Sequence, residues 1–64
     1  MSFVVTVNDG LACWSQDAMD ALRLAETCKR EAPQARVVVG YGEVSDVHGS
    51  VKVSGPIHPV MVVN

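Results

Sequence analysis

Only one segment of this chain, residues 16–32, has the periodicity of a helix, and most of the remaining sequence alternates as strands do. Its apolar positions fall within a stripe about 160° wide when successive residues are separated by 100°. The stripe consists of Ala18, Ala21, Leu22, Leu24, Ala25 and Cys28. The side chains outside the stripe include Asp20, Arg23, Glu26, Thr27 and Arg30. The pattern therefore predicts one buried helix face, whose alanines allow close packing against a sheet.

Both ends of this helix carry capping signals. Ser15 is the candidate N-cap, because its hydroxyl can accept a hydrogen bond from a free backbone N–H two or three residues later. The carboxylate of Asp17 suits the positive end of the helix dipole. Trp14 and Met19 then occupy the two positions of a hydrophobic staple, which would fix the entry of the chain. Pro33 is expected to end the helix.

The N-terminal segment predicts a strand followed by a turn. Residues 2–7 alternate, with Phe3 at the start of one apolar face. Residues 8–10, Asn-Asp-Gly, interrupt this alternation with turn chemistry that accepts positive φ at low cost. Residues 11–14 fit either a short second strand or an irregular approach to the helix, and the pattern leaves both open.

The second half of the chain predicts a hairpin. Residues 35–39 are the strongest predicted strand, since a run that is apolar on both sides is typical of the centre of a sheet. Residues 40–42, Gly-Tyr-Gly, predict a bulge or bend, and residues 43–47 continue extended. His48 and the glycine after it predict the hairpin tip, and residues 50–53 alternate as the return strand.

Prolines mark the C-terminal part of the sheet as an edge. Pro56 and Pro59 cannot donate to a ladder of strand hydrogen bonds, so residues 55–59 are expected at a sheet edge or a bulge. Residues 60–63 resume extended structure. Residues 1–64 are therefore expected to form a single α+β domain of order β-α-β-β. In it, one helix (about 16–32) packs on a three- to four-stranded, mainly antiparallel sheet.

The number of valines is large for a sheet that one helix covers. The chain has thirteen valines in 64 residues, and they fill both faces of the predicted strands. A core of this size seldom supplies more than about 3 to 5 kcal/mol of stability, and exposed apolar surface of this extent is normally hidden by association. We therefore expect a homo-oligomer, a dimer or higher, formed through the open sheet face or the C-terminal edge strand. The alternative occupant is a larger protein partner.

Charge and apolar run length exclude two classes of partner. Five Lys and Arg against seven Asp and Glu give a net charge of −2, without the basic surplus that direct nucleic-acid binding requires. No apolar run approaches the roughly 18 to 20 residues of a membrane span. The cysteines, Cys13 and Cys28, follow no signal-peptide pattern. We therefore expect an intracellular, cytoplasmic protein with reduced thiols.

Chemical motifs are scarce in this chain. The candidate metal donors are Cys13, Cys28, His48 and His58, and their spacing contains neither C-x-x-C nor H-x(3–5)-H. Cys28 lies on the buried helix stripe, where a free cysteine usually acts as a small apolar side chain. No nucleophile, base and orienting group stand in a recognisable pattern. We therefore expect no catalytic, cofactor or metal site and no enzyme activity.

The remaining features favour protein binding. Trp14 and Tyr41 combine apolar area with a polar group and recur as interface anchors, and His48 stands at the predicted hairpin tip. The expected function is a small non-enzymatic protein–protein interaction module, with inhibition of a larger host protein or complex as one form of that activity. A further class is a subunit that only extends another chain's sheet.

The alternative function comes from the order of the elements. A β-α-β-β chain of this length is similar to dodecin-type flavin-binding proteins. The resemblance implies a closed homo-oligomer that holds a small ligand between its subunits. That family stacks its flavin on a tryptophan of the strand after the helix, where this chain has Val37 to Val39. The alternative is therefore a homo-oligomeric small-ligand-binding protein with dodecin-like topology.

Overall fold

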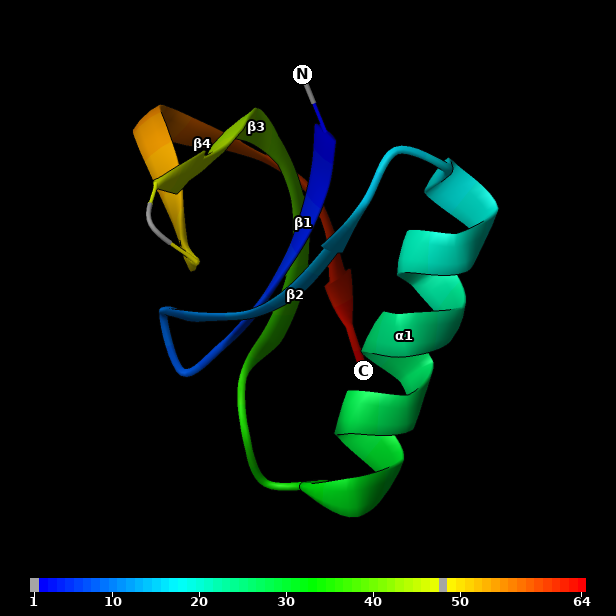
Figure 1. Ribbon diagram of the computed structural model, residues 1–64. Coiled ribbons are helices and arrows are strands. Elements are labelled where there is room, and N and C mark those ends of the chain that lie inside the picture. The colour runs from blue at the N-terminus through cyan, green and yellow to red at the C-terminus, as the bar shows by residue number, and fades with distance from the viewer. Residues whose placement is uncertain (1, 48) are drawn as a thin grey trace.

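The computed structural model describes residues 2–47 and 49–64, which form four strands and one helix (Figure 1). The elements are β1 (Ser2–Val7), β2 (Gly10–Ser15), α1 (Ala18–Glu31), β3 (Val37–Val47) and β4 (Ser50–Val63). The strands form one sheet in the order β2-β1-β3-β4, and every neighbouring pair is antiparallel. Strands β2 and β4 are thus the two edges of the sheet.

The expected fold class is confirmed, because one helix packs on a four-stranded antiparallel sheet. The segment that the sequence left open, residues 11–14, belongs to strand β2. The order along the chain is therefore β-β-α-β-β, one strand more than the order on which the likeness to dodecin-type proteins rests. Strand β3 lies between β1 and β4, as its consecutive valines predict.

A tight turn joins β1 to β2 and also fixes the start of β3. Asn8 and Asp9 take positive φ angles of 51° and 68°, while Val7 pairs with Gly10. The Asn8 backbone N–H donates to the carbonyl oxygen of Arg36 at 2.9 Å, and the Asn8 Oδ1 accepts from the Arg36 N–H at 3.0 Å. The turn predicted at residues 8–10 is confirmed, and it holds the connection between α1 and β3.

The helix begins two residues later than expected, so the predicted N-cap is wrong. Asp17 is the N-cap, and its Oδ1 accepts from the Met19 N–H at 3.0 Å. Ser15 instead ends β2, where it pairs with Phe3 and its Oγ accepts from the Asp17 N–H at 3.1 Å. Pairing with β1 keeps Ser15 extended. The staple is also wrong, because Met19 now follows the cap closely and is 61% exposed.

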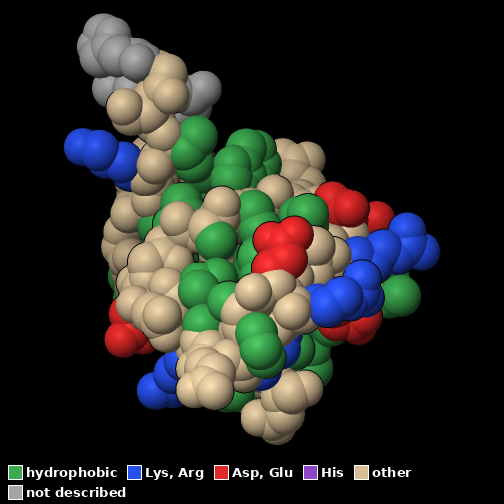
Figure 2. Space-filling model, turned by 90° about the horizontal axis from the view of Figure 1, so that it is seen from below, with side chains coloured by type: hydrophobic (Ala, Val, Ile, Leu, Met, Phe, Trp, Pro, Cys, Tyr) green, Lys and Arg blue, Asp and Glu red, His purple; other side chains and the backbone are tan. Residues whose placement is uncertain are grey.

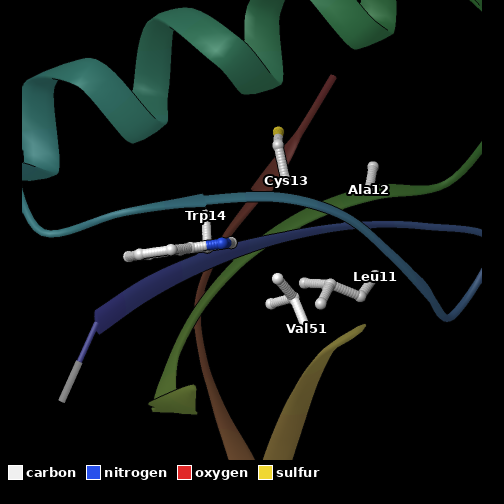
Figure 3. Close-up of a pocket in the computed structure, with 5 residues that line it drawn as sticks. All are labelled: Leu11, Ala12, Cys13, Trp14 and Val51. Carbon is white, nitrogen blue, oxygen red and sulfur yellow. The ribbon is translucent and has the colours of Figure 1, made fainter. Parts of the chain in front are cut away.

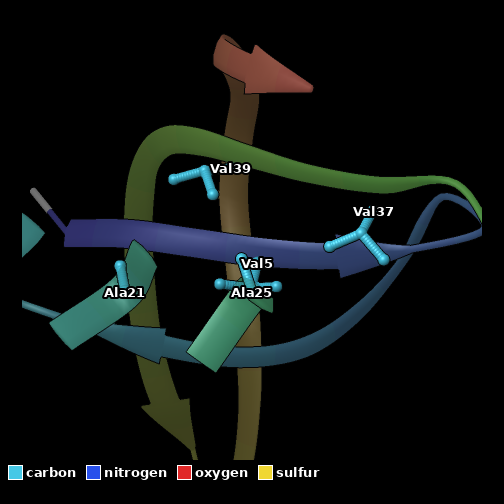
Figure 4. Packing of buried hydrophobic residues seen from close by; sticks show 5 residues of the cluster. All are labelled: Val5, Ala21, Ala25, Val37 and Val39. Atoms are coloured by element: carbon cyan, nitrogen blue, oxygen red, sulfur yellow. The ribbon is translucent and has the colours of Figure 1, made fainter. Parts of the chain in front are cut away.

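The core lies between α1 and one face of the sheet, as the helix stripe predicts. Ala21 and Ala25 face Val5, Val37 and Val39, and all five are buried (Figure 4). The small alanine side chains let the helix backbone lie close to the sheet. Partly buried apolar side chains surround this cluster, namely Phe3, Val7, Cys13, Leu24, Cys28 and Val63. After Ala32 caps the helix, Pro33 follows as expected.

The opposite face of the sheet is covered in part by the chain itself. Beyond β1, strands β3 and β4 continue as a two-stranded arm, residues 43–47 and 50–54, in which Glu43 pairs with Ser54. The arm lies on the side of β1 away from α1 (Figure 1). Ser2, Val4 and Thr6 of β1 point to this side and are buried. At these residues the chain therefore buries the face that α1 does not cover.

Two glycines allow β3 to bend so sharply. The register between β3 and β4 shifts between Val39 and Gly40 and again between Tyr41 and Glu43, which confirms the bend predicted at residues 40–42. A Cβ atom at Gly40 would overlap Cγ2 of Ile57. At Gly42 it would lie 3.4 Å from Cγ1 of Val53. The absence of side chains at these two positions lets β4 close over the bend.

Candidate functional site: an apolar groove beside strand β2

An apolar groove separates edge strand β2 from the start of β4. Four consecutive residues of β2 line it, Leu11, Ala12, Cys13 and Trp14, together with Val51 of the arm. Its volume is about 370 Å³. Figure 3 shows Leu11, Trp14 and Val51 on the side of β2 away from α1, whereas the Cys13 side chain points toward the helix. We call this site the Trp14 groove.

A β-bulge in β2 builds the groove. Trp14 is opposite Val4, and Cys13 is opposite Val5, but the next partners are Leu11 and Thr6, so that Ala12 is an extra residue. In a regular strand, residues three apart point to opposite faces. Because of the bulge, Leu11 and Trp14 both lie on the face turned away from α1. Their side chains can therefore act on one ligand.

The side chains of the groove are apolar and only half covered. Trp14 is 41% exposed, Val51 39% and Leu11 36%. Asp, Glu, Lys, Arg and His are absent from the described residues that line the groove. Strand β2 is also an edge, so its outer side has backbone N–H and C=O groups without a neighbouring strand. The groove thus offers apolar contact area beside free main-chain hydrogen-bonding groups.

Two of the three predicted anchors, Trp14 and Tyr41, lie on opposite sides of the sheet. Tyr41 is opposite Phe3, on the helix side of the sheet, and their ring centroids are 5.0 Å apart with an interplanar angle of 57°. Trp14 lies on the other side of the sheet. His48 lies outside the described residues. The structure therefore separates Trp14 from Tyr41, and it adds Leu11 and Val51, which sequence reasoning missed.

A second apolar surface follows the other edge of the sheet. Val60 is 61% exposed and Val62 48%, with the half-exposed Met61 between them. Beside Val62 lies a smaller hollow of about 220 Å³, lined by Thr6, Asp9, Arg36, Val38, Ile57, Pro59 and Val62. The prolines do lie on an edge strand, as predicted. We call residues 60–63 of β4 the C-terminal edge.

Cys13 is the residue of the groove lining whose side chain ionises. Burial raises the pKa of the Cys13 thiol, with smaller contributions from the Cys28 thiol and the Asp20 carboxylate. His58 is exposed on β4, opposite Tyr41. Within residues 2–47 and 49–64, no three His, Cys, Asp or Glu side chains are placed to hold a metal ion together.

The surface carries charges of both signs. On the face shown in Figure 2, acidic and basic side chains are interspersed and apolar side chains lie between them. Among the residues that the structure describes, no helix has the length and apolar character needed to cross a membrane.

Comparison with models of known protein families, with curated proteins and with solved structures found no match.

Proposed function

We propose that this protein is a small non-enzymatic interaction module that binds a larger protein through the Trp14 groove, and that it acts as an inhibitor of that protein or complex. The observation that carries the proposal is the convergence of three half-exposed apolar side chains, Leu11, Trp14 and Val51, around one groove. Tryptophan is enriched among the residues that dominate binding energy at protein interfaces.

The free edge of β2 indicates how a partner binds. An extended segment can add as a strand to an open sheet edge, where main-chain hydrogen bonds supply affinity and alternate side chains enter pockets. In this chain the groove opens along the same strand whose outer edge is free. The ligand we propose is therefore an extended, apolar segment of the partner. One or two of its side chains would bury Trp14.

The chemistry of the lining agrees with binding. Leu11, Ala12, Trp14 and Val51 offer no group that transfers a proton or attacks a carbon. Cys13, the fifth lining residue, turns its thiol toward α1 (Figure 3). The burial that raises the pKa of this thiol lowers its thiolate fraction at neutral pH. These features favour apolar recognition over nucleophilic catalysis.

The test compares two exposed apolar residues. Immobilised wild-type protein, Trp14→Ala and Met19→Ala would be exposed to extract of the source cells, and retained proteins would be quantified by mass spectrometry. We expect a protein that wild type and Met19→Ala retain and Trp14→Ala loses. With that protein purified, Trp14→Ala should raise Kd by at least about tenfold. The proposal would be contradicted if wild type, Trp14→Ala and Met19→Ala retained this protein equally and bound it with the same Kd.

A second copy of the chain is the competing occupant of the apolar surface, and the C-terminal edge favours it. Residues 60–63 carry no charge, so two copies paired edge to edge would place no like charges opposite each other. Native mass spectrometry reports the subunit count directly. If the edge forms a dimer, Val62→Lys should give a monomer, while Trp14→Ala should remain dimeric. A wild-type monomer at all concentrations would exclude this occupant.

A further inference from the structure

Two thiols from different elements meet on the helix side of the sheet. Cys13 is opposite Val5 in the register of β1 and β2, and Val5 packs on Ala21 and Ala25 of α1. Cys28 follows Ala25 by three residues and therefore lies on the same helix face. Both cysteines pack against that buried cluster, and both are half-buried. Figure 3 shows the Cys13 side chain directed at α1.

The raised pKa of the Cys13 thiol agrees with this placement. Burial is its main cause, and the Cys28 thiol adds to the shift. Strand β2 and helix α1 both pack on the buried cluster, so the fold brings the two thiols to the same cluster from facing elements.

We propose that Cys13 and Cys28 form a reversible intramolecular disulfide that joins edge strand β2 to helix α1, by exchange with a small-molecule disulfide such as oxidised glutathione. This assignment does not depend on the proposed binding function. It revises the view of Cys28 as only a small apolar side chain. The bond would close a loop of about 15 residues, a length for which cross-linking restricts the unfolded chain appreciably.

The exchange proceeds in two balanced steps. The thiolate of one cysteine attacks a sulfur of oxidised glutathione, which forms a mixed disulfide and releases one glutathione thiolate. The second cysteine loses its proton, attacks the protein sulfur of the mixed disulfide and releases the second glutathione. The two cysteines are thereby oxidised, one glutathione disulfide is reduced to two thiols, and the two protons end on the released glutathiones.

The test follows the intact mass of the protein in a glutathione redox buffer. Wild type should lose the mass of two hydrogens and carry no glutathionyl group. Cys13→Ser and Cys28→Ser should each stop at the mixed disulfide. The ratio of disulfide to dithiol at a fixed buffer should be at least about tenfold higher in the folded protein than in denaturing urea, because the fold already holds the thiols together.

A matched variant tests whether the disulfide forms because the fold brings the two cysteines together, or only because they are close in the sequence. The double variant Thr27→Cys with Cys28→Ser moves the second thiol by one residue onto the exposed face of α1. We expect this variant to accumulate mixed disulfides, with no preference for the disulfide in the folded state. Wild type that stays reduced, that keeps two glutathionyl groups or that oxidises no more readily than this variant would overturn the proposal. The urea sample shows that the reagent is active in each case.

Discussion

Ile57 of β4 lies directly over Gly40 of β3, so closely that a Cβ atom at Gly40 would overlap the Cγ2 atom of Ile57. The same Cβ would also come within 3.2 Å of the His58 carbonyl oxygen and 3.6 Å of Cγ2 of Val4. This contact joins the bend of β3 to the buried side chain of β1 on the face away from the helix. The folding of β4 across that face depends on the missing side chain.

Gly40→Ala should therefore destabilise the protein by about 1 to 3 kcal/mol, since the added methyl group overpacks a site bounded by a β-branched side chain and backbone. Gly10→Ala is the matched control, because its Cβ would meet only the Val7 carbonyl oxygen at 3.6 Å, an ordinary contact. Urea denaturation measures the free energy of unfolding of both variants. The cost of Gly40→Ala should shrink in an Ile57→Ala background. An unchanged cost there would show that Ile57 is not the obstacle.

The two faces of β1 are equally buried at Val4 and Val5. Val4 and Val5 point to opposite faces, and both are fully buried. Val4→Ala and Val5→Ala should each cost about 2 kcal/mol, because each leaves a cavity among packed side chains. Chemical denaturation of both variants at low protein concentration tests this. A cost near zero for Val4→Ala alone would mean that β4 does not cover Val4 in solution.

The start of the helix can be assigned by substitution. Asp17→Ala removes the side chain that accepts from the Met19 N–H, and it should cost about 1 kcal/mol. Ser15→Ala removes an exposed hydrogen bond to the Asp17 N–H at the end of β2 and should cost less. Thermal melts of both variants give the comparison. If Ser15→Ala were the more costly change, the helix would begin at the position that its sequence first indicates.

The raised pKa of the Cys13 thiol fixes the direction in which its alkylation and its contribution to stability depend on pH. Burial raises its pKa, followed by contributions from Cys28 and Asp20. The pH midpoint for alkylation of Cys13 should therefore be higher in the folded protein than in denaturing urea, as measured by peptide mass mapping. Because the unfolded thiol ionises first, its contribution to stability is complete below the unfolded pKa and is lost as pH rises through the folded value. Coincident midpoints would contradict this.

Local sequence patterns were sufficient to predict the buried face of the helix and the central strand. The apolar stripe of α1 and the alternation in β1 depend on neighbouring residues alone, and Asn8 and Asp9 carry their own turn preference. The N-cap was not predictable in this way. Ser15 and Asp17 both have side chains that accept from a backbone N–H, and the pairing of Ser15 with Phe3 decides between them.

The Trp14 groove could be predicted only in part. Trp14 stands out by residue type, but its partners depend on the bulge at Ala12 and on where the arm brings Val51. Both are set by contacts between strands distant in the sequence. Tyr41 has the same residue-type signal as Trp14, yet its pairing with Phe3 places it on the opposite face. A pattern of anchors along the chain therefore does not reveal which anchors share a surface.

Trp14 is the only tryptophan in the chain, so it reports on its own groove without a label. The most direct test of binding at the Trp14 groove is acrylamide quenching of Trp14 fluorescence in the free protein and in its complex with the partner protein. A tryptophan-free partner, or one with its tryptophans replaced, keeps the signal specific. If the partner buries Trp14, its emission should shift to the blue and its quenching constant should be lower in the complex. Emission and quenching unchanged at saturating partner would contradict it.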